Sequence, residues 1–248
     1  MDKTINKKSF FRSELNGLRA VSLIFVVLHH INKEIINYSF LGVDIFFVIS
    51  GYVMAASNFE IKSNNGWVFF VNFLSKRFKR LLPLLLVYIS IFGFLICLFD
   101  GSPGFTLKTG LTAIFGISNI FLYISSSNYF ADELNLNPFT QTWSLGVETQ
   151  FYLIFSLFTI ISFSHRKRGY NKSFIYLIFI LSIVSLFFYL KTNPLNPIAT
   201  FYLTPFRFWE FGIGIITFLL FKKNYLGKEL KKFPAAELCF LILILSLF

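Results

Sequence analysis

The amino-acid sequence predicts an all-α fold, a polytopic bundle of transmembrane helices. Of its 248 residues, 55% are hydrophobic and only 14% are charged, whereas a soluble domain carries about 25% charged residues. The apolar residues also come in runs long enough to cross a bilayer, for which a helix needs about 20 residues. We therefore expect lipid to be the solvent for most of the chain.

The apolar runs predict the helices in chain order. They lie at about residues 16–33, 38–58, 81–99, 143–164, 174–190 and 206–221, with a partial run from about 235. Residues 100–108 and 191–205 are rich in Pro, Gly and Asn, which predicts loops. The last run stops at Phe248, too soon to span a bilayer. We therefore expect about seven helices plus one re-entrant segment, in a chain truncated from a longer bundle.

The re-entrant segment is residues 109–125, a short apolar run that Gly, Ser and Asn interrupt. If the Lys-rich N-terminus is cytoplasmic and this segment returns to its starting side, all but four of the 23 Lys and Arg lie inside, as the positive-inside rule requires. A crossing segment would instead move the basic residues 165–168 outside. Irregular backbone at membrane depth needs surrounding protein or a wet cavity, so this choice also predicts a cavity.

The formal net charge of +11 raises the question of a nucleic-acid partner. The positive residues sit in short clusters between apolar runs, so we expect contact with the lipid bilayer and no nucleic acid. Cys97 and Cys239 fall inside apolar runs and are interpreted as small hydrophobic residues. No CxxC or HExxH pattern occurs, so no metal site is predicted.

Arg19 and His30 are ionisable residues within the first predicted helix. They are eleven residues apart, about three turns and about 16 Å along the axis, so both point to the same side. In one interpretation they line one wall of a pore. In the other, Arg19 reaches the inner headgroups and His30 only packs between helices.

Three carboxylates share the predicted depth of His30, in the outer half of the membrane. Asp44, Glu148 and Glu210 each lie early in a helix that is expected to begin outside. A carboxylate beside an imidazole fixes its tautomer and raises its basicity, which suits a general base. The alternative is that these carboxylates bond neighbouring helices.

A basic cluster at residues 76–80 precedes the helix predicted at 81–99 and is placed at the inner face. It is either an anchor on anionic lipid or a phosphate clamp. In the clamp, Arg77 and Arg80, at i and i+3, converge on a polyanion such as coenzyme A. Trp143 and Tyr152 are interpreted as interfacial or packing aromatics.

Five motifs in order then resemble one known family. They are residues 11–20 followed by His30, and residues 40–52, 77–80, 142–152 and 206–210. Together they are similar to the acyltransferase-3 family, the membrane O-acyltransferases of the O-antigen acetylase type. Asn16 stands where the family usually has Asp, and Gln141 where a His is common. These departures put secondary roles in doubt.

The resemblance implies about ten helices, so residues 1–248 would form a single transmembrane acyltransferase domain without its C-terminal part. It implies a bacterial cytoplasmic membrane enzyme that moves an acetyl group from acetyl-CoA, with no metal, to a polysaccharide or lipid-linked sugar. The implied roles are donor binding by Arg19, Arg77 and Arg80, base catalysis by His30 oriented by Asp44 or Glu148, and substrate binding by Trp143, Arg207 and Glu210. Two alternatives remain, a proton-coupled transporter or flippase and an inactive truncated member.

Overall fold

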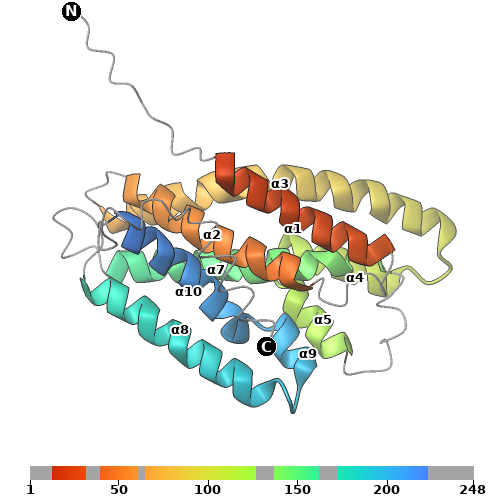
Figure 1. The fold of residues 1–248 in the computed structure, drawn as a ribbon. Helices are drawn as coiled ribbons and strands as arrows, with labels where there is room; N and C mark the ends of the chain where they lie inside the picture. The colour runs from red at the N-terminus through yellow and green to blue at the C-terminus, as the bar shows by residue number, and fades with distance from the viewer. Residues whose placement is uncertain (1–12, 32–39, 61–64, 127–136, 162–171, 223–248) are drawn as a thin grey trace, which may run out of the picture. The chain divides into compact units, whose positions relative to one another are not determined.

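The computed structural model describes residues 13–31, 40–60, 65–126, 137–161 and 172–222, and every element there is a helix (Figure 1). This confirms the all-α prediction. The helices are α1 (Ser13–Ile31), α2 (Phe40–Glu60), α3 (Gly66–Phe99), α4 (Gly104–Ile114), α5 (Ser118–Ser126), the 3-10 helix η1 (Thr140–Thr142), α7 (Trp143–Ile161), α8 (Lys172–Thr192), α9 (Pro197–Tyr202) and α10 (Thr204–Lys222).

The chain divides into two compact units. The first consists of Met1–Ser57 with Ile213–Phe248, and the second is Asn58–Gly212. In the first unit, α1 and α2 meet at Gly42, where a Cβ atom would lie 2.6 Å from the carbonyl oxygen of Ser22. The later part of α10 packs on α2, with the Phe218 ring edge-on to Tyr52 at 5.4 Å. Small residues at such contacts let membrane helices approach closely.

In the second unit, α3 and α7 run antiparallel. The Tyr88 hydroxyl donates to the carbonyl oxygen of Pro138 at 2.7 Å, just before α7. Fifteen residues earlier on α3, the Phe73 ring lies 5.7 Å from that of Phe155. The first half of α7 therefore faces the middle of α3. Fully buried aromatic rings form the core between these helices and α8: Phe69, Phe73, Phe151, Phe155 and Phe174.

The predicted re-entrant segment is a broken helix that turns back on itself. Gly116 has φ 70° between α4 and α5, which have 11 and 9 residues and are each about 15 Å long. Neither could cross a hydrocarbon core of about 30 Å. The Phe105 ring of α4 lies 5.6 Å from the Phe121 ring of α5, so α5 returns alongside α4. This geometry fits a segment that enters and leaves on one side.

The described helices expose much apolar surface. Two of them are long and apolar enough to cross a membrane, Gly66–Phe99 and Phe174–Thr192, and only 11% and 22% of their most apolar windows are buried. Leucine and phenylalanine side chains on them are largely exposed, as at Leu84 (76%) and Phe94 (65%). Such a surface suits lipid better than water. The described residues do not establish the predicted count of seven spanning helices.

Three predicted boundaries were wrong. α3 begins at Gly66 rather than near residue 81, because Asn65 caps it through a bond from the Trp67 amide at 2.9 Å and the following Lys and Arg favour helix. The loop predicted at 100–108 already contains the start of α4. The loop predicted at 191–205 contains α9, which Asn196 caps and Pro197 begins.

Candidate active site

Arg77, Tyr152 and Glu148 form a compact cluster between α3 and α7. The guanidinium carbon of Arg77 lies 5.4 Å from the centre of the Phe73 ring and 5.5 Å from that of Tyr152. The Tyr152 hydroxyl donates to Glu148 Oε1 at 2.6 Å. Tyr152 is buried, whereas Arg77 and Glu148 are partly exposed. The cluster thus joins a cation, two aromatic rings and a carboxylate at an accessible place.

This cluster contradicts the predicted difference in depth between Arg77 and Glu148. The sequence predicts Arg77 at the inner face and Glu148 in the outer half, but the side chain of Tyr152 contacts both. The error arises because α3 begins about four turns earlier than predicted and the first half of α7 lies against its middle. Charge counting assigns helices to sides of a membrane but does not set their register.

Arg80 lies one turn beyond Arg77 on α3 and is exposed, as are Lys76 and Lys79. The basic cluster is therefore part of a continuous helix rather than a segment before it. An anion that reaches Arg77 would also meet the charge of Arg80, because side chains at i and i+3 are neighbours on a helix surface.

Arg207 and Glu210 form a buried ion pair at the start of α10. Their side chains are 5% and 0% exposed, and Arg207 Nη1 lies 2.8 Å from Glu210 Oε1. The guanidinium also lies 5.9 Å from the Trp143 ring and 5.5 Å from the Phe201 ring. The structure thus brings the three predicted substrate-binding residues together, as a buried ion pair beside aromatic rings. The spacing i, i+3 could have predicted the pair.

A polar network centred on Gln150 was not predicted from the sequence. The Gln150 amide donates to Asn119 Oδ1 at 2.7 Å and to the Gly116 carbonyl at 3.1 Å, and its Oε1 accepts from the Thr204 hydroxyl at 2.5 Å. Asn119 Nδ2 donates to the carbonyl of Tyr202 at 3.0 Å. The network therefore satisfies backbone carbonyls at two helix ends, those of α4 and α9, and it holds the start of α10 through the Thr204 hydroxyl.

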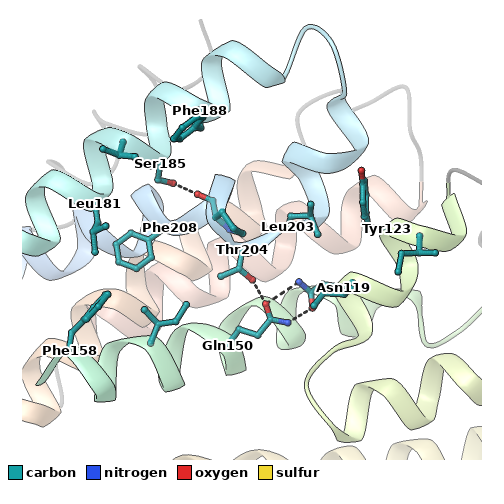
Figure 2. Close-up of a pocket in the computed structure, with 15 residues that line it drawn as sticks. Asn119, Tyr123, Gln150, Phe158, Leu181, Ser185, Phe188, Leu203, Thr204 and Phe208 are labelled. Carbon is teal, nitrogen blue, oxygen red and sulfur yellow. Dashed lines mark hydrogen bonds between the residues drawn. The ribbon is translucent and has the colours of Figure 1, made fainter. Parts of the chain in front are cut away.

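A cavity of about 760 Å³ opens beside this network, between α5, α7, α8 and the start of α10 (Figure 2). Its walls are mostly aliphatic and aromatic, and several of them, such as Ile124, Val184 and Phe188, belong to the exposed apolar surface. Asn119, Gln150 and Thr204 supply polar groups on one side. The volume is that of an ordinary ligand pocket.

The first unit holds the remaining predicted residues. Arg19 and His30 both lie on α1, and Arg19 is half-buried, but the side chain of His30 lies outside the described residues. Asp44 is 5% exposed in the first turns of α2. In the second unit, Cys97 is exposed on α3. Cys239 falls outside the described residues. Where side chains are described, no group of three or more His, Cys, Asp or Glu is placed to hold a metal ion.

Comparison with known proteins tests the family resemblance directly. A family model described as an acyltransferase domain matches residues 12–248. The chain belongs to the acyltransferase-3 family. The cluster at Arg77 therefore unites two of this family's motifs, residues 77–80 and 142–152, and the buried pair belongs to a third, residues 206–210.

Relatives within the acyltransferase-3 family carry O-acetyltransferase names. "Putative O-acetyltransferase SAS0844" of Staphylococcus aureus strain MSSA476 is 33% identical over 181 residues, which cover 73% of this chain and 30% of that protein. "O-acetyltransferase OatA" of S. aureus strain NCTC 8325 is 34% identical over 174 residues, which cover 69% of this chain and 28% of that protein. The match thus spans about 30% of the length of these relatives. No solved structure gives a significant match.

Proposed function

We propose that the chain is the membrane part of an O-acyltransferase that moves an acetyl group from cytoplasmic acetyl-CoA to a hydroxyl of a cell-surface or lipid-linked polysaccharide. The observation that carries this proposal is the cluster at Arg77, in which two distant family motifs meet around a partly exposed guanidinium. Acyltransferase-3 membership supports acetyl transfer, and the cluster supports an anionic donor.

The donor phosphates bind Arg77 and Arg80 in this proposal. Arginine presents a planar fork of N–H groups that matches phosphate oxygens. Arg77 lies eleven residues into α3, about 16 Å from its start. In this proposal the thioester arm of the donor extends from there into the helix bundle. Arg19 guides the donor along the wall of α1.

His30 is the proposed general base. The hydroxyl oxygen of the sugar attacks the thioester carbonyl carbon while the imidazole accepts the hydroxyl proton. The carbon–sulfur bond then breaks, and the imidazolium returns the proton to the thiolate, which leaves as free CoA. Asp44 is the carboxylate proposed to orient the imidazole, because Glu148 accepts from Tyr152 beside Arg77. A cation near the carbonyl oxygen, for which Arg207 is the candidate, stabilises the developing charge.

The cavity supports a lipid-linked form of the acceptor. Its mouth is framed by apolar side chains that belong to the exposed surface, so its occupant would enter from the bilayer rather than from water. A hydrocarbon chain in this cavity would hold a sugar headgroup near the membrane surface. Trp143, Arg207 and Glu210 are then the proposed substrate-binding side chains.

The test uses the intact gene product, purified into lipid vesicles and supplied with acetyl-CoA and a polysaccharide acceptor. Free CoA should appear only when both substrates are present, and the acetyl group should be recovered as an ester on the acceptor. His30→Ala should abolish both products while membrane insertion is retained. A proton-coupled transporter, the alternative from the sequence, would release no CoA.

A further inference from the structure

We propose that Tyr152 is a positioning residue for the donor: its ring holds the Arg77 guanidinium in the orientation that binds phosphate, and Glu148 anchors the ring through the phenol. This inference rests on the proposed function, in which Arg77 binds CoA. Tyr152 would then do more than act as the interfacial or packing aromatic that the sequence predicts.

The contacts of Tyr152 lead in two directions. Its ring lies 5.5 Å from the guanidinium carbon of Arg77 and edge-on to Phe73 at 6.3 Å and 88°. Its hydroxyl donates to Glu148 Oε1 at 2.6 Å, one turn earlier on α7. The side chain is only 4% exposed, so its surroundings fix the ring and the hydroxyl at the same time. Tyr152 thus connects the cation of α3 to the carboxylate of α7.

Aromatic rings attract the face of a guanidinium and leave its N–H groups directed in the guanidinium plane. The Phe73 and Tyr152 rings stand nearly perpendicular to each other, so the guanidinium can lie flat against only one of them while the other borders its edge. Together the two rings restrict the tilt of its plane. Binding a phosphate through two parallel N–H bonds needs a fixed plane, and a side chain that is already ordered loses less entropy when the ligand binds. The rings thus pre-organise Arg77 for a two-pronged contact.

Arg80 lacks such a setting in the described part of the chain, where it is exposed on the helix surface. It supplies positive charge without a fixed plane. Lysine carries the same charge but no planar fork, so a change to lysine separates the two roles. Arg77→Lys should lose most of the affinity for CoA, and Arg80→Lys should retain most of it.

The experiment measures the dissociation constant of CoA for the intact gene product in lipid nanodiscs. Tyr152→Leu should weaken binding roughly three- to thirtyfold, the range expected from the loss of one cation–π contact. Tyr152→Phe keeps the ring but loses the phenol that anchors it to Glu148, so it should weaken binding by less than about threefold. Binding of pantetheine, which carries no phosphate, should be the same in all variants. In turnover, the Leu variant should show the loss in KM for acetyl-CoA more than in kcat.

Two controls keep the outcomes distinct. Phe155→Leu removes a buried ring from the same aromatic cluster, and should leave CoA affinity unchanged even if it lowers stability. In the double variant Arg77→Ala with Tyr152→Leu, the second change should add no further loss, because the ring acts through Arg77.

Unchanged CoA affinity in Tyr152→Leu, or a loss in Tyr152→Phe as large as that in Tyr152→Leu, would overturn the positioning role. So would full affinity in Arg77→Lys, a variant that preserves the ring cluster and therefore decides the matter even if Tyr152→Leu fails to fold. The proposed function fails separately: its donor site is wrong if Arg77→Ala binds CoA as wild type does.

Discussion

The side-chain amide of Gln150 donates a hydrogen bond to the carbonyl oxygen of Gly116, at 3.1 Å. Gly116 ends α4 in a Schellman motif, with the amide of Ile117 bonded to the Thr112 carbonyl and its own amide to the Ala113 carbonyl. The Gly116 carbonyl takes no part in that motif, and its partner is the Gln150 side chain of α7. Backbone polar groups left without a partner are costly in an apolar bundle, so Gln150 makes the break in this segment possible.

Gln150→Leu should therefore destabilise the protein. The change removes hydrogen-bond partners from Gly116, Asn119 and Thr204 at once, and each buried polar group left unsatisfied costs about 1–3 kcal/mol. We expect the free energy of unfolding in detergent to fall by at least about 2 kcal/mol. Gln141→Leu is the matched control, because Gln141 is exposed just before α7. Equal stability of the two variants would contradict the role of Gln150.

Gly116→Ala tests the turn between α4 and α5. The φ of 70° disfavours a side chain, and an added Cβ would lie 2.7 Å from Thr149 Cγ2. We expect a loss of about 1–3 kcal/mol from backbone strain alone, measured as a lower unfolding midpoint in detergent. Gly104→Ala is the control, since a Cβ there meets nothing within 4 Å. If Gly104→Ala proves the more damaging of the two, the turn is not under this constraint.

The buried pair Arg207–Glu210 should respond differently to single and double substitution. Glu210→Leu removes the carboxylate that Arg207 contacts at 2.8 Å, and breaking a buried pair costs about 3–5 kcal/mol. Arg207→Met with Glu210→Leu replaces both charges by apolar groups of similar size, so stability should return close to that of wild type. Thermal unfolding measures both effects.

Acetyl-transfer activity of the double variant then tells whether Arg207 and Glu210 have a role beyond stabilising the fold. If Arg207 and Glu210 bind substrate, the double variant should remain folded and still lose acetyl transfer. A folded double variant with wild-type transfer would show that their role is structural only, and would remove Arg207 as the cation near the thioester oxygen.

Val184→Trp tests the cavity as a place for a lipid chain. Val184 lines the cavity and is 42% exposed on α8, so an indole there would fill part of the space. Transfer to a lipid-linked acceptor should fall at least severalfold while CoA affinity stays unchanged. Val87→Trp on α3, exposed to 56% and outside the cavity lining, is the control. Equal transfer by both variants would exclude this cavity from acceptor binding.

Composition and hydropathy were enough to predict the helical fold and the approximate place of most helices. The apolar content of α3 and α8 is a property of each segment alone, and a single pass along the chain detects it. The start of α3 was missed because the basic cluster looked like a boundary, whereas Lys and Arg continue a helix as readily as they flank one.

The candidate site was predicted less completely, because its residues come together only through the register in which neighbouring helices pack. The motif of residues 142–152 predicted a role for Glu148 but none for Tyr152, and only the antiparallel pairing of α3 with α7 puts Tyr152 on Arg77. Gln150 belongs to the same motif, yet its partners lie on α5 and α10. Helix α7 thus contributes Tyr152 to the cluster at Arg77 and Gln150 to the polar network. Residue spacing along α7 predicts this only when the helices packed against it are known.

Acetyl transfer itself is tested most directly by mass spectrometry of surface polysaccharides from cells that carry the intact gene, a deletion, or the gene with His30→Ala. We predict ester-linked acetyl groups in the first strain, sensitive to mild alkali, and none at those positions in the other two. The same acetylated glycans in all three strains would contradict it.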